Sequence, residues 1–216
     1  TTLVTLKQPY LSNHSSGSDL SSSIIPTLCL SPEGQVKELS ADALSIQWAS
    51  SLLQDIYDFI ESYHKSHPLT CPATIPVFQF VTCGLAMTNI PGATAQHKEV
   101  YLVEELIQPD HDGPWRKYIN NNSSHLCYFK DTNNYRCSEF LAFCQHVQYW
   151  RTGCLVFTSD FQGELHELHP YHLLTKLTMP WCKLFSKGNV QHTHHDFEKE
   201  HKCNVFCKYF KVPTSY

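Results

Sequence analysis

The feature that most constrains this chain is a short run of metal-ligand residues near its end, His201-Lys202-Cys203-Asn204-Val205-Phe206-Cys207. If the run is helical, its two thiols lie four residues apart on one face, and the imidazole two residues upstream can reach them from the helix start. Zn2+ suits two thiolates and an imidazole, and a tetrahedral site then needs one more ligand. The alternative is two buried, inert cysteines beside a surface histidine. The spacing alone leaves both interpretations open.

A fourth ligand is available in His146, which lies in a predicted helix beside Phe143 and Val147. A lone histidine in such an apolar segment is more often a core residue whose hydrogen bonds are satisfied within the protein. His146 is therefore a candidate ligand with a structural alternative.

Length and charge limit the class of protein. A chain of 216 residues suffices for one large domain or for two lobes. Its net charge of −4 provides no basic stripe, so nucleic acid is not an implied partner. No apolar run reaches the roughly 18 residues that span a bilayer, and we expect neither a membrane partner nor a signal peptide.

The ten cysteines could form a disulfide framework, and Asn13, Asn121 and Asn122 match the N-glycosylation pattern. Both features would suit a secreted, disulfide-linked binding protein that uses aromatic and histidine side chains for recognition. Disulfide-dense folds are usually small, however, and a chain of this size can bury a core without them. Cys83 and Cys144 lie in apolar segments, where reduced cysteine serves as a small hydrophobic residue. We therefore expect a reducing, cytoplasmic or otherwise intracellular environment.

Strand and helix signals alternate in the first half of the chain. Residues 3–6 form a short β-type run that ends at Lys7, and apolar residues recur at spacings of three and four over 40–67, which predicts a long helix. Residues 75–87 and 100–107 carry β-branched and aromatic side chains. The polar segment between these two runs favours a hairpin.

The composition then becomes polar, and we place a boundary there between two lobes, 1–107 and 108–216. The second lobe is expected to contain a helix over 138–150, a short buried strand at 155–157 and a last helix around 201–210. This order of elements is typical of an α+β fold rather than of regular βαβ alternation: a strand, a helix and two strands, followed by a more helical half.

Two oxygen-bearing side chains follow the predicted strand at 155–157. Asp160 and Gln162 stand two residues apart and so should project to the same side, with Gly163 making the turn. A carboxylate and an amide oxygen suit Mg2+ that carries phosphates, although a plain surface turn is the alternative. Lys7 at a strand end could hold nucleotide phosphates, but a lone lysine is usually solvated.

Further polar candidates occur on both sides of the lobe boundary. Lys117 and Asn121 offer a cation and an amide that could position phosphate, or else belong to an ordinary polar loop. Glu104 and Glu105 end an apolar strand, where one carboxylate could pair with Lys7 and the backbone could meet a ligand edge.

In this order, the segments resemble the alpha-kinases, atypical protein kinases that include elongation-factor-2 kinase and the kinase domains fused to TRP channels. They are most similar to the set of such domains in basidiomycete fungi. The residues that carry the resemblance, besides the C-terminal run, are 4–10, 101–107, 115–121, 140–149, 159–163 and 184–190.

The resemblance implies a two-lobed, kinase-like α+β fold and transfer of the ATP γ-phosphate to a serine or threonine of a protein substrate. ATP, Mg2+ and a structural Zn2+ in the C-lobe are the implied cofactors. The implied zinc ligands are His146, His201, Cys203 and Cys207, and the implied magnesium ligands are Asp160 and Gln162. The implied nucleotide contacts are Lys7, Glu104, Glu105, Leu106, Ile107, Lys117, Asn121, Gly188 and Asn189.

One catalytic position departs from the family pattern. The family follows its Asp-x-Gln-Gly motif with Thr-Asp-Pro, whose aspartate is expected to meet the substrate hydroxyl. This chain reads Glu167-Leu168-His169-Pro170, one residue shorter, so that His169 falls near the place of the acid. A histidine can act as a base near neutral pH, but its reach and charge differ from those of a carboxylate. We expect ATP binding with impaired phosphotransfer; the alternative is a pseudokinase scaffold that binds nucleotide, a protein partner or both without transferring phosphate.

Overall fold

The computed structural model of the chain describes residues 3–11, 28–68, 70–88, 98–107, 115–120, 123–163, 171–178 and 190–214. These residues form two compact units: unit 1 comprises Thr1–Ala43 and Thr82–Leu106, and unit 2 comprises Leu44–Val81 and Ile107–Tyr216. The division passes through the long helix α1 (Pro32–Ser66), so the units interleave along the sequence. The contiguous lobes drawn from the sequence, 1–107 and 108–216, stay a prediction.

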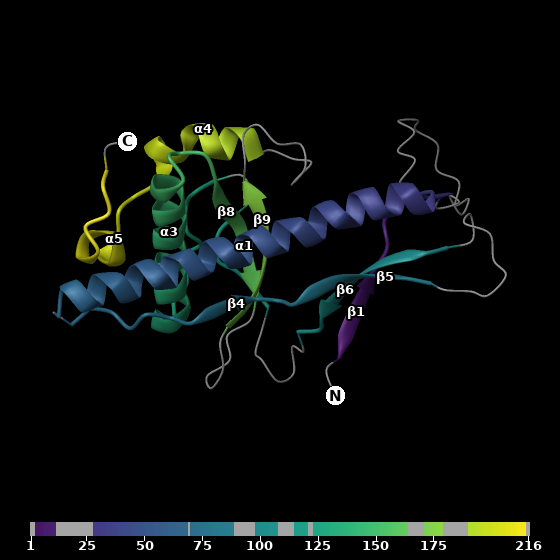
Figure 1. Cartoon of the computed structure of the whole chain (residues 1–216). Coiled ribbons are helices and arrows are strands. Elements are labelled where there is room, and N and C mark those ends of the chain that lie inside the picture. Colours follow the sequence, from purple (N-terminus) through teal and green to yellow (C-terminus); the bar gives the residue numbers. More distant parts are fainter. Residues whose placement is uncertain are drawn as a thin grey trace. The chain divides into compact units, whose positions relative to one another are not determined.

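Unit 1 contains a three-stranded antiparallel sheet (Figure 1) in the order β1 (Val4–Lys7), β6 (Val100–Glu105) and β5 (Cys83–Met87). The predicted hairpin is therefore confirmed as β5–β6. Alternate residues of β6 are buried, and Val100 and Leu102 pack with Leu39 of α1. A separate two-stranded ribbon joins β2 (Tyr10–Leu11) to β3 (Leu28–Cys29).

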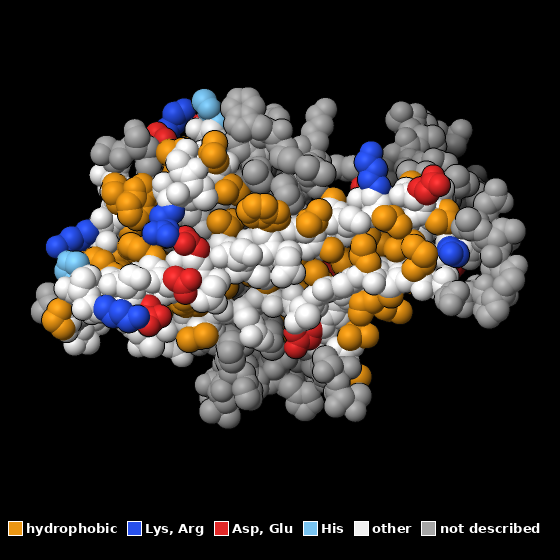
Figure 2. All heavy atoms as spheres, in the orientation of Figure 1, with side chains coloured by type: hydrophobic (Ala, Val, Ile, Leu, Met, Phe, Trp, Pro, Cys, Tyr) orange, Lys and Arg blue, Asp and Glu red, His pale blue; other side chains and the backbone are white. Residues whose placement is uncertain are grey.

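Helix α1 begins two turns before the predicted start at residue 40. Pro32 suits the first helical position because its fixed φ is already helical, and the Ser31 hydroxyl accepts a hydrogen bond from the Gly34 amide at 3.2 Å. Hydrophobic side chains lie at the surface along this helix (Figure 2). Among them, Leu44 and Trp48, part of the apolar pattern that predicted the helix, are 47% and 52% exposed.

The predicted strand over 75–87 is in fact two strands. β4 (Phe78–Phe80) belongs to unit 2, β5 belongs to unit 1, and Val81 and Thr82 separate them. A continuous apolar run predicts extended backbone, but it does not say which sheet each part will join.

Unit 2 contains a four-stranded sheet in the order β4, β9 (Tyr171–Thr178), β8 (Phe157–Gly163) and β7 (Arg116–Lys117). β4 pairs with β9 in parallel and the other pairs are antiparallel. Helix α3 (Thr132–Arg151) packs against β8 and α5 (Val205–Tyr209), and α4 (Val190–Glu200) contacts β9. β7, β9 and α4 were not predicted from the sequence.

Helix α3 is the centre of the unit 2 core. Asp131 caps its start by accepting a hydrogen bond from the Asn134 amide at 2.8 Å, which is why the helix begins earlier than the predicted residue 138. Phe143 on α3 is fully buried and stacks on Phe210 at a centroid distance of 5.1 Å. Phe206 meets Phe140 edge to face at 5.3 Å, so an aromatic core holds α5 against α3.

No helix among the residues that the structure describes has both the length and the hydrophobicity required to cross a membrane.

Candidate functional site

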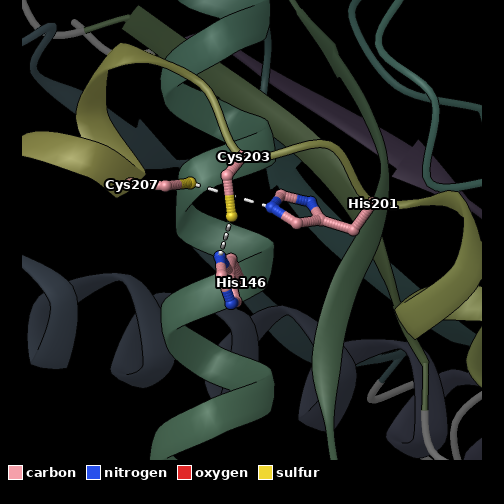
Figure 3. A group of neighbouring side chains, drawn as sticks. All are labelled: His146, His201, Cys203 and Cys207. Atoms are coloured by element: carbon pink, nitrogen blue, oxygen red, sulfur yellow. Dashed lines mark hydrogen bonds between the residues drawn. The ribbon is translucent and has the colours of Figure 1, made fainter. Parts of the chain in front are cut away.

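Four predicted metal ligands converge in unit 2. Their ligand atoms all lie within 4.8 Å of one another, and the side chains point toward a common centre (Figure 3). Cys203 Sγ lies 3.7 Å from His146 Nδ1, and Cys207 Sγ lies 3.7 Å from His201 Nε2. His146 comes from α3, Cys207 from α5, and the other two from the link between α4 and α5.

The single helix predicted over 201–210 is wrong, because residues 201–204 are not helical. Asn204 is the reason: its side-chain oxygen accepts hydrogen bonds from the amides of Phe206 at 3.0 Å and Cys207 at 3.3 Å, which starts α5 there. Its Nδ2 also donates to the carbonyl of Glu139 at 2.6 Å and so ties the helix start to α3. The ligands meet across a capped break rather than along one helical face.

The imidazoles of His146 and His201 are held in the neutral form, in which a ring nitrogen can bind a metal. His146 Nε2 lies 2.9 Å from the carbonyl oxygen of Pro213; since a carbonyl only accepts, Nε2 carries the proton and Nδ1 presents its lone pair to Cys203. Burial lowers the pKa of His146, and burial together with the neighbouring His146 lowers the pKa of His201 to about 3. Burial raises the pKa of Cys207 to about 12, so this thiol must lose its proton when a metal binds.

The spacing of the cluster fits a tetrahedral ion. With metal–sulfur bonds of about 2.3 Å and metal–nitrogen bonds of about 2.0 Å, adjacent ligand atoms of a tetrahedron stand roughly 3.5 Å apart. The two sulfur–nitrogen pairs described above, each at 3.7 Å, are close to this distance. The cluster of two imidazoles and two thiols is therefore compatible with a metal site.

A second group of predicted residues meets where β7 pairs with β8. Lys117 lies opposite Gln162 in the ladder, and its Nζ is 2.6 Å from Oδ1 of Asp160. The Asp160 side chain is only 6% exposed, whereas that of Lys117 is 39% exposed. A buried carboxylate thus faces a cation that is open to solvent on its other side.

The backbone around Asp160 differs from the predicted turn. β8 continues through Gly163, and a bulge shifts its register on β9 between Ser159 and Gln162. Asp160 adopts φ +57°, a conformation that is disfavoured for a residue with a Cβ. The two-residue alternation that predicted a shared side for Asp160 and Gln162 does not hold across the bulge. Such strained conformations cluster at functional sites.

In unit 1, the predicted pair between Lys7 and a carboxylate forms with Glu104. The Glu104 side chain is 5% exposed and that of Lys7 is 50% exposed. β6 ends at Glu105, whose amide donates to the Thr82 carbonyl at 2.9 Å, and the Leu106 amide donates to the Leu3 carbonyl at 3.0 Å. Two backbone donors of segment 104–107, whose residues are implied nucleotide contacts, are therefore already engaged within this unit.

Four predicted site residues lie outside the described residues: Asn121, His169, Gly188 and Asn189.

A set of hydrogen bonds beside the cluster was not predicted from the sequence. Glu200, next to the ligand His201, accepts hydrogen bonds from the Ser123 hydroxyl at 2.9 Å and from the Ser124 amide at 3.0 Å. These bonds join the end of α4 to the segment that follows Lys117. In the sequence, the only hint of these hydrogen bonds is that an acidic residue stands next to a candidate ligand.

Eight cysteines in the described part of the chain are free: Cys71, Cys83, Cys127, Cys137, Cys144, Cys154, Cys203 and Cys207. The disulfide-linked binding protein considered above would need most of its cysteines paired. The structure therefore does not favour that alternative.

Comparison with known proteins gives a consistent result. A model of the alpha-kinase family matches residues 30–207. The apoenzyme alpha-kinase domain of myosin-II heavy chain kinase A is 16% identical and superposes with a TM-score of 0.54, covering 83% of this chain and 59% of that one. No curated protein sequence matches.

Two ligand complexes of the myosin heavy chain kinase A domain are also similar. The AMP complex is 14% identical (TM-score 0.53, 84% of this chain and 62% of that one). An inactive variant bound to ATP is 15% identical (TM-score 0.55, 88% and 64%). The chain thus spans less than two thirds of each structure, and similarity at this level of identity concerns the fold.

Proposed function

The chain belongs to the alpha-kinase family, and from this premise we propose that it is a protein kinase domain. It binds ATP with Mg2+ and transfers the γ-phosphate to a serine or threonine of a protein substrate. The observation that carries the proposal is Asp160, a buried and strained carboxylate in contact with the half-exposed Lys117. The AMP and ATP complexes of the similar domains add support. The closeness to fungal members stays a prediction.

Phosphoryl transfer requires positioning and charge neutralisation more than covalent help from the protein. In our proposal, Asp160 and Gln162 supply oxygen ligands for Mg2+, which when bound neutralises phosphate charge. Lys117 and Lys7 contact phosphates, and each is already oriented by a nearly buried carboxylate. Since the amides of Glu105 and Leu106 are engaged, adenine would meet the carbonyl groups of segment 104–107 or the backbone of Ile107.

We also propose that the cluster of His146, His201, Cys203 and Cys207 holds Zn2+. The donor set, its burial and its spacing support this ion. Four protein ligands leave no open position for a substrate, so the proposed role is structural.

The nucleotide site is tested by thermal unfolding with ATP and Mg2+. At a free nucleotide concentration of about 100 times Kd, binding stabilises the folded state by about 2.7 kcal/mol, which raises Tm by roughly 5–10 °C for a chain of this size. Asp160→Ala should abolish the Mg2+-dependent part of this shift. Glu61→Ala, which removes a surface carboxylate paired with Lys65, serves as the matched control and should keep the shift. A wild-type chain without any shift, although its metal cluster is loaded, would leave a pseudokinase scaffold as the better function.

Transfer itself is expected to be weak. Loss of general-base assistance typically costs about 10²–10⁴ in rate, and the acid of the family motif is replaced near His169. Incubation with γ-labelled ATP and mixed protein substrates should yield slow labelling, confined to phosphoserine and phosphothreonine on amino-acid analysis. Label on tyrosine would contradict the proposed specificity.

A further inference from the structure

Two glutamines on α3 are buried although their amides are polar. Gln145 is 0% exposed and Gln148 is 2% exposed, and they flank the candidate ligand His146. Both bind the backbone of one residue: Gln145 Nε2 donates to the Thr158 carbonyl at 2.8 Å, and the Thr158 amide donates to Gln148 Oε1 at 2.8 Å. Burial of polar groups is unfavourable unless they are bonded, and Thr158 provides a partner for one polar atom of each amide. The other atoms, Gln145 Oε1 and Gln148 Nε2, are buried without a hydrogen-bond partner among the described residues.

The position of Thr158 explains why side chains bind it there. In the ladder of β8 with β9, Thr158 lies opposite Leu177, and every second residue of an antiparallel strand turns its backbone groups away from that partner. On the other side, β7 reaches β8 only at Gln162 and Gly163. The edge of β8 at Thr158 is therefore covered by the two amides of α3, which take the place of a neighbouring strand.

Asp160 lies between this anchor and a second one. On its far side, the Phe161 carbonyl accepts hydrogen bonds from the amides of Tyr118 at 2.8 Å and Ile119 at 3.3 Å, and the Phe161 ring stacks on Phe80. A φ of +57° persists at a non-glycine residue only where the surroundings determine it. Here hydrogen bonds hold the backbone at Thr158, two positions before Asp160, and at Phe161, one position after it.

We propose that Gln145 and Gln148 are positioning residues for Asp160. They fix the strand before the bulge and so hold the carboxylate where it can bind the proposed Mg2+, and this inference rests on the function proposed above. Because the same turn of α3 carries His146, the two glutamines also connect the metal cluster to the strand of Asp160. Both side chains act through Thr158 and neither touches the proposed Mg2+.

The test is a Mg2+ titration at fixed ATP, followed by thermal unfolding, for wild type, Gln145→Met and Gln148→Met. Methionine keeps the length of the side chain and removes the hydrogen bond. Removal of a residue that orients a metal ligand typically costs 10–100-fold, so we expect the Mg2+ midpoint to rise about tenfold in each variant. Tyr149→Phe is the control, since it removes a 2.9 Å bond from the same turn to Glu198 of α4 and should leave the midpoint unchanged.

Lower Tm with an unchanged Mg2+ midpoint in both methionine variants would show a merely structural role and overturn the proposal. Amide hydrogen exchange of the wild type provides a measurement that depends neither on variants that fold nor on nucleotide. Thr158 is expected to exchange as slowly as residues paired within the sheet, and exchange at the rate of an exposed amide would overturn the proposal. If ATP and Mg2+ do not raise the Tm of the wild type, the proposed function is contradicted instead. In that case the exchange rate of the Thr158 amide still shows whether the two glutamines hold Thr158.

Discussion

Cys207→Ser should release the metal and destabilise the chain more than any surface substitution. The thiol is buried in α5 and faces His201, so the variant loses a charged ligand and leaves three others around an incomplete site. Loss of a structural metal belongs to the exceptional class of changes above about 4 kcal/mol, which corresponds to roughly 10 °C in Tm for this length. Elemental analysis of pure protein should fall from near one zinc per chain to background.

Cys137→Ser is the matched control for this experiment. Cys137 is equally buried on α3 but lies outside the cluster, so the variant makes the same atomic change without removing a ligand. It should keep its zinc. Zinc retained at wild-type level in Cys207→Ser, or zinc absent from the wild type, would show that the cluster is not the proposed site.

Proton release gives the same experiment a second readout. Burial raises the pKa of the metal-free Cys207 thiol to about 12, so at neutral pH the empty site holds its thiol proton. Zinc binding to the Cys207 thiolate should therefore release this proton, and zinc affinity should rise with pH. Acid should release the metal, because protons compete for the thiolates.

The four candidate metal ligands are indicated by the sequence only in part, because the spacing leaves inert cysteines as an open alternative and the complete set is implied by the resemblance to the alpha-kinases. The structural reason for their convergence could not be predicted from the sequence. The sequence analysis placed Cys203 and Cys207 on one helical face, whereas the Asn204 cap breaks the helix between them. Asparagine is a familiar cap, but its role here depends on α3 being close enough to take its second hydrogen bond.

The elements that escaped prediction share a weak local signal. α4 is only 11 residues long, and among its described side chains Phe197 is the one large apolar side chain that is fully buried, so few apolar positions mark this helix in the sequence. The bulge at Asp160 has no signal at all, because the residue in the left-handed conformation is not glycine. Its conformation depends on distant partners, Thr158 with α3 and Phe161 with Tyr118, which no short window of sequence contains.

The division of residues 75–87 between two sheets has a similar cause. β-Propensity mainly reflects how a side chain packs in its sheet, and both halves of the run are equally suited to extended backbone. β4 finds its partner in β9, more than 90 residues later, whereas β5 finds its partner in β6, the next strand along the chain. Only the second pairing is local enough to be predicted.

Phe206→Ala should separate the contribution of packing from that of the metal. Phe206 immediately precedes Cys207, is 0% exposed, and contacts Phe140 at 5.3 Å and Phe143 at 5.9 Å between ring centroids. Truncation of such a ring leaves a cavity and typically costs about 3–5 kcal/mol. Because no ligand is removed, the folded variant should still contain one zinc per chain. Denaturant unfolding measures the loss in free energy of unfolding, and elemental analysis measures the zinc content.

Tyr128→Ala is the aromatic control, since its ring is 79% exposed and its loss should change the free energy of unfolding by no more than about 0.5 kcal/mol. Both Phe206 and the ligands fix α5 on α3, so the double variant Phe206→Ala/Cys207→Ser should be destabilised by less than the sum of the two single changes. Full additivity would mean that the aromatic core and the metal cluster act independently. Loss of zinc in the folded Phe206→Ala variant would mean that the core, rather than the ligand set, keeps the site assembled.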